Sequence, residues 1–144
     1  MIFLSMDKIL VAIDFTEVSK AVLARAKKLV LAFDARLCII HVEPDGDVYA
    51  REEDNLEFHL ETSHKIDAVR KEFNEANIFP YFKEASGLPA KCILNECERF
   101  KPDVLILGAY RYSKLIRIWS DNLREEMIAK APCSVLLVHP DDEV

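Results

Sequence analysis

Two residues at the ends of apolar stretches are candidates for binding chemistry. Asp14 follows the run KILVAI (8–13), and its carboxylate could accept a hydrogen bond from a base or sugar, or hold a metal. Alternatively, it caps the next turn, because aspartate readily binds backbone amides two residues on. Gly108 follows VLIL (104–107) and either lets the backbone approach a ligand or merely suits the turn. The sequence leaves both alternatives open at each position.

A small basic patch follows Gly108. Arg111, Lys114 and Arg117 form the one local cluster of positive charge in a chain whose formal net charge is −6. These side chains could neutralise a phosphate or the carboxylates of a partner, or they could simply be solvated. We keep them as candidates because ligands of parallel α/β sheets bind at loops that leave the carboxyl ends of strands.

The sequence lacks the residue patterns of several common kinds of binding and catalytic site. Neither G-x-G-x-x-G nor G-x-x-x-x-G-K-[ST] occurs among the three glycines, which excludes dinucleotide and P-loop sites. The four histidines show no metal-ligand grouping, and no serine has a nucleophile context. His41 lies in an apolar run, where a hydrogen-bonded core histidine is expected rather than a catalytic base. We therefore predict no catalytic residue and no metal site.

Composition predicts one globular domain spanning residues 1–144, with 51% hydrophobic and 31% charged residues. A pI near 5.2 argues against nucleic acid and against anionic membrane surfaces as partners. The four cysteines form no C-x-x-C pair, which predicts reduced thiols in an intracellular protein. No apolar run approaches the roughly 20 residues of a membrane span, so we expect a cytoplasmic protein.

The elements that would position these candidates alternate between strand and helix. Continuous apolar runs predict strands at 8–13, 36–42, 78–85, 104–107 and 134–138. Apolar residues at helical spacing predict the intervening helices, the first of them capped by the hydroxyl of Thr16. A long helix over 54–76 is expected to bury the stripe Leu56, Leu60, Ile66, Val69 and Phe73.

This alternation predicts an α/β fold in three layers, with helices on both faces of a five-stranded parallel sheet. Pro80 cannot donate to a ladder and places the third strand at an edge. Right-handed crossovers then favour the strand order 3-2-1-4-5. Asp14 and Gly108 would leave the two strands at the switch point and face each other across a crevice.

Five segments together resemble the universal stress protein family over residues 6–140. They are KILVAID, LCIIHVEP, SGLPAKCIL, KPDVLILGA and KAPCSVLLVHP. The resemblance implies a fold like that of the adenine nucleotide alpha hydrolases. It also implies a homodimer in which the fifth strands pair, through Ser134, Val135, Leu136, Leu137 and Val138.

ATP-binding members of this family carry Gly-x-x-Gly, nine residues, then Gly-Ser/Thr after the fourth strand. Here Gly108 matches the first glycine, but Arg111, Asp121 and Asn122 occupy the other three positions. Arg111 places a side chain where a backbone would approach the phosphates, and Asp121 adds negative charge there. The resemblance implies that any nucleotide would contact Asp14, Val42, Gly108 and Asn122, and the basic patch adds Arg111 and Lys114 as contacts.

The leading hypothesis is a non-enzymatic, homodimeric stress-response protein that works through protein contacts, without a cofactor and without tight ATP binding. The alternative is an ATP- or AMP-binding switch with a degenerate phosphate loop, using ATP with Mg²⁺, with slow hydrolysis as a further option. An adenylate-type enzyme of the same fold is a third option, which the missing glycine motif disfavours. An Asp14→Ala variant is expected to impair a switch and barely affect a scaffold.

Overall fold

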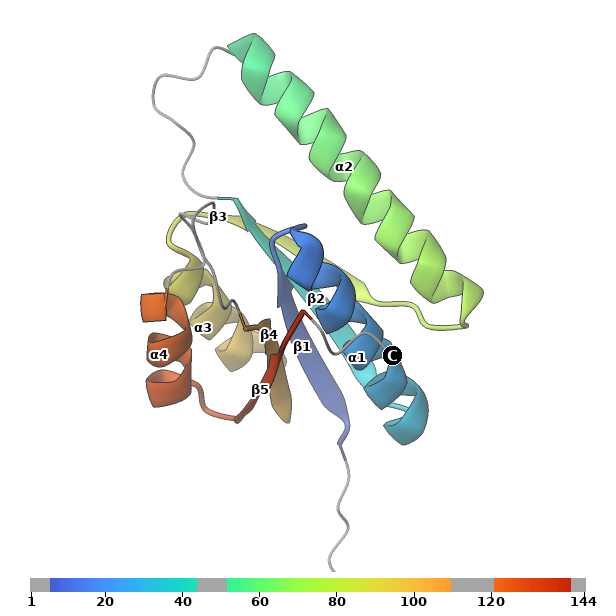
Figure 1. Cartoon of the computed structure of the whole chain (residues 1–144), viewed down its shortest axis with the longest axis vertical. Coiled ribbons are helices and arrows are strands. Elements are labelled where there is room, and N and C mark those ends of the chain that lie inside the picture. Colours follow the sequence, from blue (N-terminus) through green and yellow to red (C-terminus); the bar gives the residue numbers. More distant parts are fainter. Residues whose placement is uncertain (1–5, 44–51, 110–120, 141–144) are drawn as a thin grey trace, which may run out of the picture.

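The computed structural model describes residues 6–43, 52–109 and 121–140, in which strands and helices alternate along the chain. The elements are β1 (Lys8–Ile13), α1 (Glu17–Phe33), β2 (Arg36–Glu43), α2 (Glu52–Glu75), β3 (Tyr81–Ser86), α3 (Pro89–Phe100), β4 (Val104–Gly108), α4 (Asp121–Lys130) and β5 (Ser134–Val138). The five strands form one parallel sheet in the order β3-β2-β1-β4-β5 (Figure 1). The predicted fold class and strand order are confirmed.

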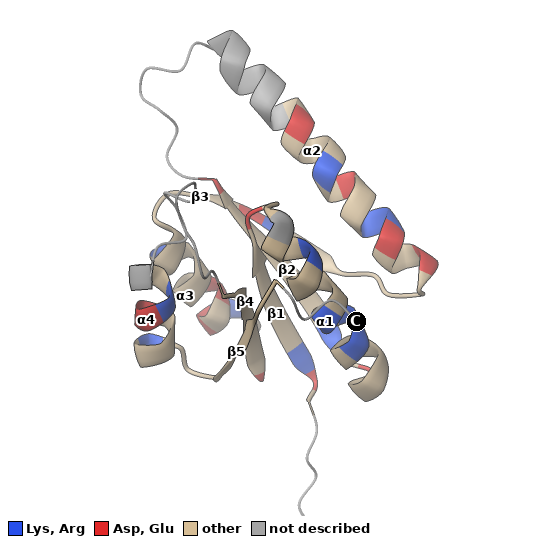
Figure 2. Ribbon diagram, viewed as in Figure 1, with Lys and Arg blue, Asp and Glu red and all other residues tan. Residues whose placement is uncertain are grey.

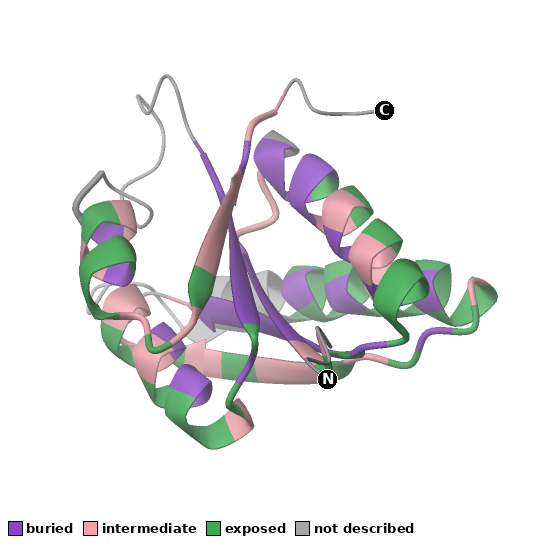
Figure 3. Ribbon diagram, turned by 90° about the horizontal axis from the view of Figure 1, so that it is seen from below, coloured by how far each residue is buried: buried purple, intermediate pink, exposed green. Residues whose placement is uncertain are grey.

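Helices cover both faces of the sheet, which gives the predicted three layers. Ile9, Val11 and Ile13 of β1 pack on one face in a core that α1 and α2 share. Leu10 and Ala12 pack on the other face with α3 and α4. Figure 3 shows the central strands buried between these layers. A strand enclosed in this way has no polar face, which is why its sequence is apolar without alternation.

Asp103 fixes the start of β1 against β4. Its Oδ2 accepts hydrogen bonds from the backbone N–H groups of Asp7 (2.7 Å) and Lys8 (2.9 Å). The register then pairs Ile9 with Val104. One carboxylate therefore aligns two segments that lie 96 residues apart in sequence.

Four predicted strand boundaries differ from the structure, and two of them, the ends of β3 at Ser86 and of β4 at Gly108, lie one residue later than predicted. The second strand extends one residue further, to Glu43, and the third begins at Tyr81 rather than at residue 78. Ile78 is buried, but its N–H donates to the carbonyl of Phe73 (2.9 Å) and closes the end of α2 instead of joining the sheet. The prediction that this strand lies at an edge is confirmed.

The stripe predicted for α2 holds only in its later turns. Ile66 and Phe73 are buried and Val69 packs against the core that contains Phe73, but Leu60 is 54% exposed, so its predicted burial is wrong. Leu56 lies outside the residues whose side chains are described. A 24-residue helix is about 36 Å long, whereas a six-residue strand spans about 20 Å. The first turns of α2 therefore project past the sheet (Figure 1), and the described later turns carry charges of both signs (Figure 2).

Three helices are followed by non-glycine residues in the left-handed region. These are Asp34 (φ 52°), Asn77 (φ 60°) and Lys101 (φ 54°). The N–H of Asp34 donates to Val30 and closes α1, and Lys101 closes α3 in the same way. Such closures normally favour glycine, because a Cβ is strained at positive φ.

Candidate functional site

The carboxyl ends of the strands bring Asp14, Val42 and Gly108 to one edge of the sheet. Asp14 directly follows β1, Gly108 ends β4, and β1 pairs with both β2 and β4. Ile13 is in register with His41, so Asp14 and Val42 lie level with each other. The strands that carry Asp14 and Gly108 are neighbours, as predicted. Val42 itself is buried in the core beside α3 and α4.

The carboxylate of Asp14 closes the turn between β1 and α1. Its Oδ1 accepts hydrogen bonds from the N–H of Thr16 (3.0 Å), the hydroxyl of Thr16 (2.5 Å) and the hydroxyl of Ser19 (3.0 Å). The capping alternative raised from the sequence is therefore observed. The prediction that the Thr16 hydroxyl caps α1 is wrong: this hydroxyl accepts no cap hydrogen bond, and it donates instead to the Asp14 carboxylate.

Gly108 is required by packing inside the protein. A Cβ at this position would lie 2.8 Å and 3.0 Å from the two γ-methyl carbons of Val18, which begins the buried face of α1. Among the described residues the only glycine with positive φ is Gly87, so turn geometry does not explain Gly108. The absence of a side chain at Gly108 lets α1 approach β4 closely.

A buried histidine packs beside Asp14, and the sequence did not reveal its surroundings. Phe15 has φ 60°, and its ring lies 4.8 Å from that of His41, while Lys65 Nζ lies 5.9 Å from the same phenyl ring. His41 is buried as predicted, but among the described residues its Nδ1 has no hydrogen-bond partner, so the expected hydrogen bonding is wrong there. Burial lowers the pKa of His41, and the nearby charge of Asp14 opposes this.

The predicted phosphate side of the crevice is only partly described. Arg111, Lys114 and Arg117 lie in 110–120, outside the described residues. Asp121 and Asn122 form the first turn of α4. The side chains of these two residues lie outside the described part of the chain.

The fifth strand is the outermost strand on one side of the sheet, opposite β3. The carbonyl of Val138 accepts from the N–H of Ala109 (2.8 Å), so the backbone groups of Val138 face β4. Successive residues of a strand direct these groups to opposite sides. The backbone groups of Val135 and Leu137 therefore point to the open edge, where no other described strand pairs with them.

Metal and thiol chemistry receive little support from the described part of the chain. Within it, no three His, Cys, Asp or Glu residues are grouped so that they could hold a metal ion. All four cysteines are free thiols, and burial raises the pKa of Cys38 and of Cys97 to about 12. Among the described helices, none is both long and apolar enough to span a bilayer.

Comparison with known proteins agrees with the fold. A model of the universal stress protein family matches residues 6–139. A universal stress protein of Thermus aquaticus, described as encoded in the QAH/OAS sulfhydrylase 3′ region, is 30% identical over 135 residues, covering 90% of this chain and 96% of its own. The solved structure of UspA from Lactobacillus plantarum is similar with a TM-score of 0.74 and 21% identity, covering 94% of this chain and 99% of that one.

A further solved universal stress protein was obtained in complex with cAMP. It is similar with a TM-score of 0.65 and 18% identity, covering 95% of this chain and 99% of its own. At this identity the likeness concerns the fold. The family match, the Thermus relative and the shared sheet topology agree over nearly the whole length. The chain therefore belongs to the universal stress protein family.

Proposed function

We propose that this protein is a non-enzymatic regulatory member of its family, active as a cytoplasmic homodimer through contacts with other proteins and without tight ATP binding. The observation that carries the proposal is the loss of the glycine motif. Arg111, Asp121 and Asn122 stand where ATP-binding members have two glycines and a serine or threonine. Without those glycines the backbone amides are not free to close around phosphates.

Two of the residues that the resemblance places at a nucleotide, Asp14 and Gly108, have structural roles within the fold. Asp14 closes the turn after β1 through hydrogen bonds to Thr16 and Ser19. Gly108 makes room for Val18. Their presence is thus explained without a nucleotide, and it does not argue for one.

The test is a nucleotide assay on the full chain purified without added nucleotide. Protein is denatured, released nucleotides are separated by chromatography, and fresh protein is then titrated calorimetrically with Mg-ATP. We expect no stoichiometric nucleotide and no binding heat at millimolar ATP. Bound ATP or AMP, or a micromolar dissociation constant, would overturn the proposal.

The second candidate is an adenine-nucleotide switch, with slow hydrolysis as a further possibility. The relative solved with cAMP favours it, because that protein shares the fold and a carboxyl-edge crevice follows from the same topology. In this case Arg111 and Lys114 would pair with the phosphates in place of backbone amides. Arg111→Ala would then weaken ATP binding at least about tenfold.

An Asp14→Ala variant no longer separates the two candidates. It removes three hydrogen bonds to Oδ1, so it is expected to disturb the start of α1 whether or not a nucleotide binds. Arg111→Ala is the sharper variant, with Lys91→Ala on the exposed side of α3 as its control. Phosphate release from Mg-ATP measures any hydrolysis in the same samples.

A further inference from the structure

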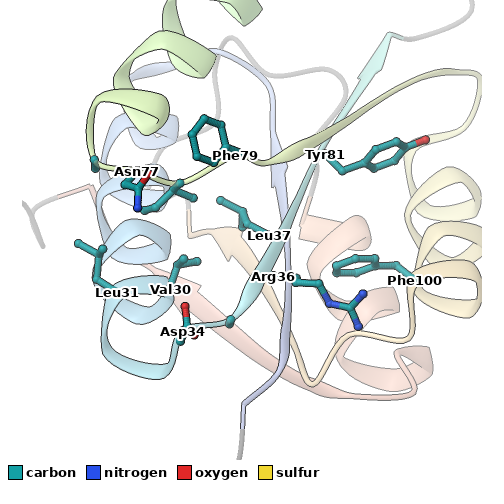
Figure 4. A pocket seen from close by; sticks show the side chains of 12 residues that line it. Val30, Leu31, Asp34, Arg36, Leu37, Asn77, Phe79, Tyr81 and Phe100 are labelled. Carbon is teal, nitrogen blue, oxygen red and sulfur yellow. The ribbon is translucent and has the colours of Figure 1, made fainter.

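A pocket lies at the amino edge of the sheet, where β2 and β3 begin and where α1, α2 and α3 end (Figure 4). Its volume is about 530 Å³, within the range of pockets that bind small molecules. The eight residues of β2 separate it from the carboxyl-edge crevice by about 25 Å. It is therefore a different site from the one discussed above.

Large apolar side chains are exposed around this pocket. Phe79 (73% exposed), Leu31 (59%) and Tyr81 (49%) all line it, and Phe33 at the end of α1 is also exposed. Single exposed apolar residues are ordinary on protein surfaces. Several of them around one concave surface are typical of a binding site.

Two aromatic rings of the pocket are held in place by cations. The guanidinium of Arg99 lies 4.9 Å from the ring centre of Tyr81, and Lys8 Nζ lies 5.7 Å from that of Phe100. Arg99 is itself fixed by two hydrogen bonds from its Nε to the carboxylate of the buried Glu96. Each of these two rings therefore has one cation over its face, and the charge of Arg99 is paired with that of Glu96.

Arg36 adds a cation that faces the pocket. Its side chain is exposed, and no carboxylate of the described residues forms a salt bridge with it. Figure 4 shows its guanidinium next to Phe100. A guanidinium binds carboxylate or sulfonate groups through bidentate hydrogen bonds. Asp34, which also lines the pocket, disfavours a second negative charge on the same ligand.

We propose that this pocket binds small planar aromatic molecules with one negative charge, such as aromatic carboxylates. The aromatic ring lies beside Tyr81 and Phe100, the acid group pairs with Arg36, and Phe79 bounds the other side of the pocket. This binding is independent of nucleotide binding at the opposite edge. The size of the pocket favours a small molecule, because a stable protein partner needs about 800 Å² of surface on each side.

The experiment uses anilinonaphthalene sulfonate, an aromatic monoanion that fluoresces when shielded from water, and the neutral probe N-phenylnaphthylamine. Both are titrated into the folded full chain. We expect Arg36→Gln to weaken sulfonate binding about tenfold or more and to change binding of the neutral probe by less than about twofold. Phe79→Ser should weaken both probes, and excess Mg-ATP should displace neither.

Leu88→Ser is the matched control, because Leu88 is similarly exposed (71%) but precedes α3 at the other edge of the sheet. It should leave both titrations unchanged. Leu31→Ser provides a second pocket variant whose exposed position makes loss of folding improbable. Equal sulfonate affinity in the wild type, Arg36→Gln and Phe79→Ser would overturn the proposal. So would loss of binding in Leu88→Ser, or a change of oligomeric state in Phe79→Ser, which would assign the surface to self-association.

Discussion

At the level of single residues, a family pattern can persist because the fold needs it. The resemblance predicts Asp14 and Gly108 as nucleotide contacts, yet each has a structural partner within the chain. Asp14 binds the start of α1, and Gly108 accommodates Val18. Replacing either residue therefore has a cost that is unrelated to ligands.

For Gly108 that cost can be measured with a double-mutant cycle. Gly108→Ala places a methyl group 2.8 Å from a γ-carbon of Val18, so overpacking should lower the free energy of unfolding by about 1–3 kcal/mol. In the Val18→Ala background the same change should cost less, because the clashing methyl groups are gone. Urea unfolding of the four proteins gives the coupling. Equal costs in both backgrounds would contradict the packing role.

His41 predicts how stability depends on pH. Burial lowers its pKa below the usual value of about 6.5, so between the folded pKa and 6.5 the unfolded chain binds more protons. The stabilisation that results from the lowered pKa of His41 is complete above about pH 6.5. It falls as the pH decreases toward the pKa of His41 in the folded protein. His41→Phe should flatten this slope, measured by urea unfolding at several pH values. His64→Gln, at an exposed position, should retain it.

At the level of elements, the closing residue of α3 is a site of backbone strain. Lys101 has φ 54°, a conformation that costs an L-residue about 1 kcal/mol and glycine little. Lys101→Gly should raise the free energy of unfolding by about 0.5–1 kcal/mol in denaturant titrations. Lys101→Ala keeps a Cβ and should bring no such gain. Equal gains in the two variants would mean that the lysine side chain, not the backbone, is the unfavourable feature.

Much of the architecture was predictable because its elements have strong patterns. β1 is apolar throughout and α3 begins with Pro89, so strand order and helix positions followed from local rules. Leu60 was mispredicted because periodicity does not reveal where a long helix leaves the sheet. The contacts of Phe15, His41 and Lys65 join distant segments, and no local pattern predicts them. The amino-edge pocket was not predictable for the same reason, because residues from several distant segments line it.

At the level of the whole molecule, the proposed homodimer is expected to pair through the open edge of β5. The N–H of Val135 points away from β4, so a proline there removes a bond to a second subunit and spares those to β4. Val135→Pro should be monomeric by sedimentation at concentrations where the wild type is a dimer. Val135→Thr keeps the N–H and the branched side chain and should remain a dimer. A Val135→Pro dimer would place the interface elsewhere.

The position of β1 between β2 and β4 also governs how the chain folds during synthesis. β2 is made directly after α1, but Asp103 and β4 are made about 100 residues after β1, which takes roughly 5–20 s at ribosomal speed. Until then one side of the central strand has no neighbour, and its apolar faces lack part of their cover. Nascent chains stalled before β4 should accordingly be cleaved readily by proteases, and chains extended past β5 should resist them. The middle of the sheet, the most buried part of the finished protein, is thus completed late.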